Sequence, residues 1–188
     1  MTNDELVLNA KRHGFTLIEL LVVMVIIVIL AGLILATAGY VQNKGKRSRA
    51  EAEIAAISAA LENYKADNGV YPTGAETNAL KPNTMGDPAQ KEYKDASLAL
   101  YKAISGDADN DSSRIVEAKS YFPFKPNQLD PTTQTQPVAF IKDSFGFSYG
   151  YSTAKSVPPG SDGYNPTFDL WSTGGDKAGN QSQWIKNW

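Results

Sequence analysis

The sequence predicts an α+β protein in which a long N-terminal helix packs on a small antiparallel β-sheet head. Almost every residue from Gly14 to Val41 is apolar, and Glu19 is the one charged residue of this stretch. About 20 apolar residues are enough for a helix to cross a bilayer. Beyond it, apolar residues recur at spacings of three and four, which is typical of an amphipathic helix. Near the C-terminus, aromatic residues alternate with small or polar ones, which is typical of half-buried strands.

The long helix is predicted to run from Phe15 to about Asn68, which corresponds to roughly 80 Å at the rise of an α-helix. Its first half is a membrane anchor, and its second half carries one apolar stripe that a folded head can cover. The pair Asn68-Gly69, with Pro72 shortly beyond, suits a helix C-terminus. The stripe consists of Ala50, Ile54, Ile57, Leu61 and Tyr64.

The rest of the chain is predicted to form the head. Residues 74–90 are rich in Gly, Pro, Asn and Thr and predict a surface loop, and residues 96–104 predict a short helix. The aromatic alternation over 145–151 and the segment 167–172 predict two strands that form a hairpin on the apolar stripe. We interpret this alternation as core packing, in preference to a sugar-binding platform.

Glu19 is the unusual residue of the apolar run, because a carboxylate inside a membrane is costly and marks a functional position. If the chain is cut between Gly14 and Phe15, the new α-amine lies one helical turn before Glu19. The amine and the carboxylate can then pair within one chain or between neighbouring chains. The alternative is an uncleaved single-pass anchor with Glu19 near the lipid headgroups.

The string from Gly14 to Leu21, GFTLIELL, resembles the processing motif of type IV pilins and type II secretion pseudopilins. The resemblance implies that a prepilin peptidase cuts after Gly14 and methylates Phe15, and that Glu19 recruits the subunit into a filament. It divides the chain into a cytoplasmic leader (1–14), a transmembrane helix (15–41), an amphipathic helical spine (42–69) and a periplasmic head (70–188). A conventional signal peptide, cut near Ala31-Gly32 or within 36–39, is an alternative that leaves the register of the motif unexplained.

Two further segments resemble the major pseudopilin of type II secretion systems. These are Tyr64–Thr73, YKADNGVYPT, and Phe168–Asp176, FDLWSTGGD, and the chain's Asn187-Trp188 end matches as well. The resemblance does not cover the centre of the chain, and Ala36 stands where the subfamily usually has a proline. It implies a structural subunit that self-associates into a helical filament with minor pseudopilins and an inner-membrane assembly platform. A type IV pilin for adhesion, motility or DNA uptake is the alternative.

The resemblance places the protein in the bacterial inner membrane, with its head in the periplasm until the filament forms. The distribution of basic residues predicts the opposite orientation. More of them follow the apolar run than precede it, and the positive-inside rule places the side with more Lys and Arg in the cytoplasm. We follow the motif, since peptidase access in the family requires the N-terminus inside. Contact with anionic membrane lipid is another explanation of the basic residues. Those that follow the run are Lys44, Lys46, Arg47 and Arg49, and those before it are Lys11 and Arg12.

Composition excludes several functions. The net charge of −2 gives no electrostatic reason for nucleic acid to be the main partner. The chain has no cysteine, and its one histidine, His13, precedes the proposed cut, which excludes disulfides and makes the usual zinc sites and histidine-based catalysis unavailable to the processed chain. A membrane-anchored enzyme or glycan-binding module would need a carboxylate pair such as Asp109 with Glu117, whose spacing matches no known site. We therefore expect no enzyme.

Calcium is the one cofactor that the resemblance implies. It places Asp176 and the carbonyl of Thr173 as ligands, and Asn180 adds a neutral oxygen, a set that predicts weak binding. An alternative set is Asp107, Asp109 and Asp111, which resembles the first half of an EF-hand loop. That set lacks the glycine and the final acid of such a loop, so solvated loop acids are a competing explanation.

Overall fold

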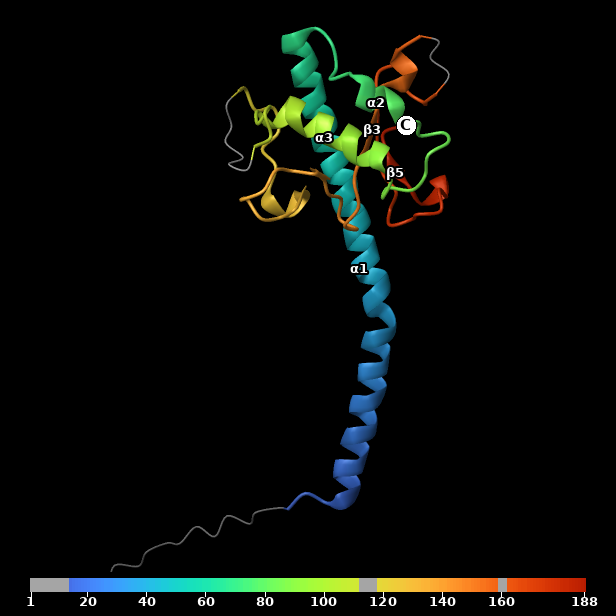
Figure 1. The fold of residues 1–188 in the computed structure, drawn as a ribbon. Coiled ribbons are helices and arrows are strands. Elements are labelled where there is room, and N and C mark those ends of the chain that lie inside the picture. Colours follow the sequence, from blue (N-terminus) through green and yellow to red (C-terminus); the bar gives the residue numbers. More distant parts are fainter. Residues whose placement is uncertain (1–13, 112–117, 159–161) are drawn as a thin grey trace, which may run out of the picture. The chain divides into compact units, whose positions relative to one another are not determined.

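The structure is a computed structural model, which describes residues 14–111, 118–158 and 162–188. The chain divides into two compact units, one up to Asn43 and one from Lys44 to Trp188 (Figure 1). The helix α1, Leu17–Asn68, supplies residues to both units. The fold class is α+β as predicted, with a long N-terminal helix and small antiparallel sheets.

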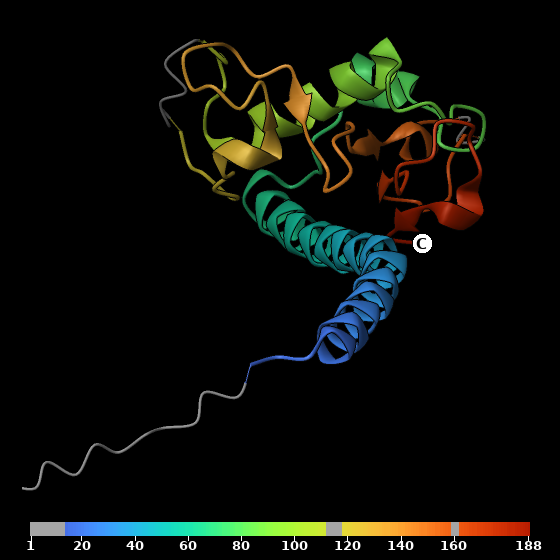
Figure 2. The same cartoon turned by 90° about the horizontal axis from the view of Figure 1, so that it is seen from below.

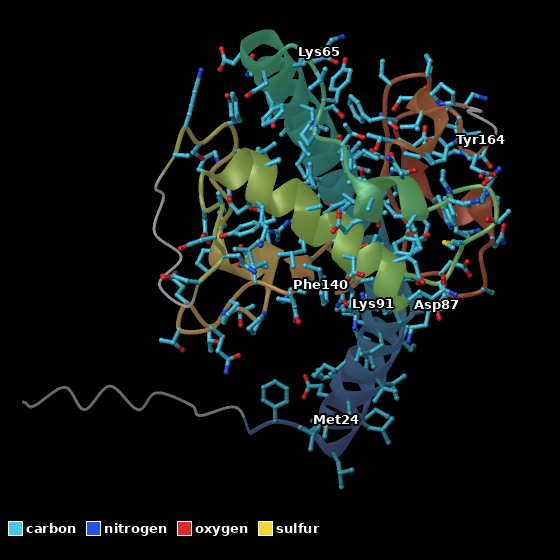
Figure 3. All side chains as sticks on the ribbon, turned by 45° about the horizontal axis from the view of Figure 1, so that its top comes forward. Met24, Lys65, Asp87, Lys91, Phe140 and Tyr164 are labelled. Atoms are coloured by element: carbon cyan, nitrogen blue, oxygen red, sulfur yellow. The ribbon has the colours of Figure 1, made fainter. Side chains whose placement is uncertain are left out.

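The described part of the first unit consists mainly of the apolar part of α1, whose large apolar side chains are exposed. Met24 is 60% exposed, and Figure 3 labels it on the apolar part of α1. Among the described residues, α1 is the one helix that is long and apolar enough to cross a membrane. This exposure is costly in water and favourable in lipid, so the unit fits a membrane-anchored, single-pass protein.

The second part of α1 buries its apolar residues on one face of the helix, as the apolar stripe predicts. Ala50, Ile54, Ile57 and Leu61 are buried in the main core, and Tyr64 packs against it half-buried. Figure 2 shows α3 and the strands of the head on one side of this part of the helix.

The helix ends at Asn68, where the sequence predicts its stop. The N–H of Gly69, at φ 79°, donates to the carbonyl of Lys65 over 2.7 Å, which is the usual left-handed termination of a helix.

Two short helices follow, and they differ from the prediction. The predicted loop over 74–90 contains a helix, α2, Ala75–Ala79, and the residue directly after this helix, Leu80, is fully buried. The helix α3, Lys91–Ser105, begins five residues before the predicted start at Ala96. Its first turn is polar except for Tyr93, which is buried against Trp171 with ring centroids 5.5 Å apart. Tertiary packing therefore extends α3 beyond its apolar sequence pattern.

The strands form two small antiparallel sheets. In one, β1, Leu129–Asp130, pairs with β2, Phe140–Ile141. In the other, the order is β3, Gly150–Ser152, then β4, Asp169–Ser172, then β5, Ile185–Lys186. The pairing of β3 with β4 confirms the predicted hairpin, and Tyr149, Tyr151 and Leu170 share the core with the stripe of α1. Short 3-10 helices lie at Pro126–Gln128, Ala154–Ser156 and Gln181–Gln183.

The predicted strand over 145–151 is wrong in its first half, which is a tight turn. The Asp143 carboxylate accepts from the N–H groups of Phe145, 2.9 Å, and Phe147, 2.8 Å. Gly146 lies at φ 92°, a conformation that few other residues adopt. Burial raises the pKa of the Asp143 carboxyl, and the Ser172 hydroxyl also donates to it over 2.5 Å.

The C-terminal segment is held by a second, aromatic cluster. Trp171 stacks on Trp184 with ring centroids 5.7 Å apart and an angle of 10°, and it meets Trp188 edge-on at 5.8 Å. Tyr164 stacks on Trp188 at 4.6 Å. Gly150 lies opposite Trp171 in the sheet, where a Cβ would come within 2.3 Å of the indole, so this position admits only glycine.

Candidate functional site

The first candidate site is the start of α1. Gly14 and Phe15 precede the helix and are exposed, with Phe15 at 80%, so the peptide bond between them is accessible. Apart from its chain neighbours, no described residue has an atom within 4 Å of the place where a Cβ on Gly14 would be. The local geometry fits a processing site at this bond.

Glu19 and Thr16 form a reciprocal cap at the helix N-terminus. The Glu19 carboxylate accepts from the Thr16 N–H over 2.9 Å and from its hydroxyl over 2.6 Å. The Glu19 N–H in turn donates to the Thr16 hydroxyl oxygen over 3.3 Å. This is a capping box, which satisfies N–H groups that the first helical turn leaves without partners. The role of Thr16 was not predicted, although the spacing T-x-x-E is the recognised sequence signal for a capping box.

The cap is one of two roles that Glu19 can have. In the uncut chain its carboxylate is occupied by Thr16. Cleavage before Phe15 would put a cationic amine next to Thr16, within one helical turn of the same carboxylate. Pairing of Glu19 with that amine stays a prediction.

The second candidate site is the loop after β4. The Asp176 N–H donates to the Thr173 carbonyl over 3.1 Å, and the Asn180 N–H donates to the Asp176 carboxylate over 2.7 Å. The loop therefore brings together the two residues that the resemblance assigns to calcium, Thr173 and Asp176, and the suggested neutral ligand Asn180.

The oxygens of this loop fit a weak calcium site. The Thr173 hydroxyl is buried without a hydrogen-bond partner in the described part of the chain, and an oxygen in that state is available to a cation. Asp176 is the one carboxylate between Thr173 and Gln183. Among the described residues, no group of three or more acids, histidines or cysteines able to hold a metal is found. The guanidinium of Arg47, which donates to the Gln183 carbonyl over 2.8 Å, adds a nearby positive charge that lowers cation affinity.

The alternative acidic set has a structural role. Asp107 is buried, and its carboxylate accepts from the Tyr101 hydroxyl over 2.7 Å and from the Asn110 N–H over 3.0 Å. The Asp109 carboxylate accepts from the Asp111 N–H over 3.2 Å. These bonds fold the loop after α3, and within the described ranges the three carboxylates do not form a metal-binding cluster. Glu117, the suggested partner of Asp109 in a catalytic pair, lies outside the described residues, as does the leader before Gly14.

Comparison with known proteins first shows that the N-terminus carries a motif of prepilin-like proteins. Residues 9–35 match the family model of the prokaryotic N-terminal methylation motif. The match includes Gly14, Phe15 and Glu19, so the chain carries the motif that marks prepilin-type processing.

A second family model and several curated relatives indicate which subfamily of prepilin-like proteins the chain is similar to. Residues 39–110 match the family model of type II secretion system protein G. Curated relatives named type II secretion system core protein G are 41% identical over 86 residues in Pseudomonas aeruginosa and 38% identical over 88 residues in Vibrio cholerae. These alignments cover 44% and 45% of this chain and 59% and 58% of the relatives, so the chain spans less than two thirds of their length. No solved structure matches. The resemblance to the pseudopilin family is thus confirmed, with the major pseudopilin as the similar subfamily.

Proposed function

We propose that this chain is a structural subunit of a pseudopilus, the major pseudopilin of a type II protein secretion system. The observation that carries the proposal is the exposed Gly14-Phe15 bond directly before a capped helix of exposed apolar residues. A helix of this kind is stable in lipid or against identical helices, and both environments are required of a subunit that moves from a membrane into a filament.

In this proposal the chain is processed after Gly14, methylated on Phe15 and anchored in the inner membrane with its head in the periplasm. It then self-associates through the apolar part of α1. Its partners are prepilin peptidase, minor pseudopilins, the assembly platform and membrane lipid. Its role is mechanical and not enzymatic. The names of the relatives favour this function over a type IV pilin for adhesion, motility or DNA uptake.

Mass spectrometry of the protein extracted from membranes tests the processing step. We expect an N-terminus at Phe15 carrying one methyl group. Gly14→Val should block the cut because it puts a branched side chain at the scissile bond, and Gly39→Ala, in the open middle of α1, is the matched control. An intact N-terminus at Met1 beside an active peptidase, or a new one near Gly39, contradicts the proposal.

A topology reporter fused at either end tests the orientation. We expect the C-terminal reporter to be active only in the periplasm. A cytoplasmic head would mean that Lys44, Lys46, Arg47 and Arg49 set the topology by the positive-inside rule, and it would contradict the periplasmic assignment.

A weak calcium site at Asp176, the Thr173 carbonyl and Asn180 is part of the proposal. Calcium bound there would draw the loop after β4 together. Asp176 would supply the charge, and the neutral oxygens would complete the coordination.

A further inference from the structure

We infer that Asn68 is a modification site, where the side-chain amide is lost by deamidation when the C-terminal end of α1 opens. Asn68-Gly69 is the one Asn-Gly pair of the chain. The reaction needs water and neither an enzyme nor a cofactor, so its rate is set by this pair and by the fold around it. The inference concerns the head alone. It goes beyond the proposed function and does not rest on it.

The chemistry follows from the glycine after Asn68. The backbone nitrogen of Gly69 attacks the side-chain carbonyl carbon of Asn68, and the new C–N bond closes a succinimide ring. The side-chain nitrogen leaves as ammonia, taking up the proton of the Gly69 N–H. Water then opens the ring at either carbonyl and leaves aspartate or isoaspartate at this position. Glycine favours the attack because it has no side chain to shield the nitrogen and its backbone turns freely.

In the folded chain the attacking nitrogen is held away from this carbon. Asn68 is the last residue of α1, and helical backbone angles direct the following N–H toward the preceding turn. The Gly69 N–H accordingly donates to the Lys65 carbonyl over 2.7 Å. The reaction therefore requires the last turn of the helix to open.

The side-chain amide of Asn68 is also held, although the residue is exposed. Its Nδ2 donates to the Tyr64 carbonyl over 2.8 Å and to the Tyr121 hydroxyl over 3.1 Å. The first bond satisfies one of the carbonyls that a helix end leaves without a partner. Both bonds must break before the side chain can turn toward the Gly69 nitrogen.

A segment from elsewhere in the head keeps this helix end closed. We name it the helix-end strap, and it consists of residues 119–121. The Lys119 ammonium pairs with the Asp67 carboxylate, and the Tyr121 ring meets the Tyr64 ring edge-on with centroids 5.2 Å apart. The Tyr121 N–H donates to a carbonyl of α3 over 2.8 Å. Unsupported helix ends open readily, so the strap is what protects this pair.

The products no longer fit the helix end. Aspartate puts an oxygen where the amide N–H group met the Tyr64 carbonyl, and two acceptors cannot bond to each other. Its negative charge also lies at a helix C-terminus beside Asp67, where the helix dipole disfavours it. Isoaspartate adds a carbon to the main chain, which displaces Gly69 from the left-handed position that ends the helix. Hydrolysis does not restore the amide, so the change is permanent.

Peptide mass spectrometry of the full-length protein in detergent measures the reaction. The protein is incubated in mildly alkaline buffer, either folded or in guanidinium chloride, and is then digested with trypsin. The peptide that begins at Ala66 contains Asn68, and its amide loss is followed by mass and by an isoaspartate assay. We expect the loss to be at least about tenfold faster in denaturant, because the folded head opens rarely. Asn63, which precedes the bulky Tyr64, should stay intact in both conditions.

Two variants loosen the helix-end strap without changing the reacting residues. Tyr121→Phe removes the hydroxyl that accepts from Asn68, and Lys119→Gln removes the ion pair with α1. Each should speed the reaction of the folded protein roughly twofold to fivefold, as the loss of one exposed contact implies, and neither should change the rate in denaturant. Tyr164→Phe, which loses a hydroxyl hydrogen bond elsewhere, and Lys125→Gln are the matched controls and should react like the unmutated protein.

Equal rates in the folded and the denatured protein overturn the protection by the fold, and no amide loss in denaturant overturns the site itself. Equal rates for the strap variants and their controls overturn the role of the strap. If a strap variant fails to fold, the unmutated protein still decides the first two points.

Thermal melting tests the consequence of the modification. Asn68→Asp reproduces the direct product and should melt at a lower temperature than the unmutated protein. Asn63→Asp makes the same charge change at an exposed position of the same helix and should melt close to the unmutated protein. Equal melting of the two variants overturns the assigned effect on the helix end.

Discussion

The Tyr149 hydroxyl donates a 2.7 Å hydrogen bond to the carboxylate of Glu53, and this bond joins the segment before β3 to α1. The same carboxylate accepts from the guanidinium of Arg49 over 3.0 Å and from the amide of Gln128 over 3.1 Å. The Glu53 carboxylate thus links α1, the 3-10 helix that ends at Gln128 and the segment before β3 through hydrogen bonds beside the apolar stripe.

Glu53→Ala should destabilise the head by about 1–3 kcal/mol, because it leaves the buried Tyr149 hydroxyl without an acceptor. Glu53→Gln keeps one acceptor oxygen and should cost less. Glu51→Ala, on an exposed position of the same helix, should change stability by no more than about 0.5 kcal/mol. Urea unfolding of the full-length protein in detergent, followed by far-UV circular dichroism, measures these differences. Equal midpoints for Glu53→Ala and Glu51→Ala would contradict the assigned role.

Buried tyrosines should make the head sensitive to alkali. Burial raises the pKa of Tyr93, Tyr149 and Tyr151 in the folded state, while in the unfolded chain it stays near 10. Below pH 10 both states hold the proton, so stability does not depend on these groups. Above pH 10 the unfolded state releases protons that the folded state keeps, so stability falls by up to about 1.4 kcal/mol per pH unit for each tyrosine.

Unfolding midpoints measured from pH 9 to pH 11 test this expectation. Tyr151→Phe should reduce the loss of stability per pH unit above pH 10 by the contribution of one tyrosine, about 1.4 kcal/mol. This expectation holds whatever the effect of the substitution on stability at neutral pH. The comparison of slopes cancels the contribution of lysines, which titrate in the same range. An unchanged slope in Tyr151→Phe would show that this hydroxyl does not carry the effect.

Glu19 can be tested with two substitutions that separate its charge from its cap. Glu19→Gln keeps an oxygen that can accept from Thr16 but loses the charge, whereas Glu19→Ala loses both. If the pairing with the Phe15 amine drives assembly, both variants should insert in the membrane and both should fail to form filaments. Crosslinked ladders from cells report assembly, and flotation reports insertion. Normal ladders from Glu19→Gln beside failure of Glu19→Ala would mean that the cap matters and the charge does not.

Calcium should stabilise the head weakly through the loop after β4. One carboxylate implies a dissociation constant no better than about 10⁻⁴–10⁻³ M, and a tenfold excess over it adds about 1.4 kcal/mol. The corresponding rise in melting temperature is roughly 3–8 °C.

Melting of the full-length protein in millimolar calcium and in chelator measures this rise, with Asp176→Ala as the variant that should lose it. Asp162→Ala, which removes an acid paired with Lys81 outside the loop, is the control and should keep it. Identical melting of the unmutated protein in both buffers excludes the site. A rise that persists in Asp176→Ala moves calcium to another part of the chain.

The sequence predicts the long helix and the core of this protein better than its short helices and its turns. The stripe from Ala50 to Leu61 and the stop at Asn68 follow from periodicity and from the left-handed preference of Gly69, which are local properties. The turn at Phe145–Phe147 could not be predicted in the same way, because alternation alone does not reveal that Asp143 captures the two backbone N–H groups.

Of the candidate sites, the one formed by residues close together in the sequence could be predicted. The motif from Gly14 to Glu19 is contiguous in sequence, and its capping box was readable from the spacing of Thr16 and Glu19. Asp107 looked like a possible ligand because its acidic neighbours alternate. Its partner Tyr101 comes from α3, and only the fold shows that this carboxylate is occupied.

The aromatic cluster at the C-terminus has an optical consequence. All three tryptophans of the chain lie between Trp171 and Trp188, and Trp184 and Trp188 contact Trp171 with ring centroids 5.7 Å and 5.8 Å away, one stacked and one edge-on. Indole emission and near-UV dichroism of the tryptophans in the unlabelled protein therefore originate from this segment alone. The chain carries a native spectroscopic probe of whether its last residues are seated on the head, in a filament as well as in a membrane.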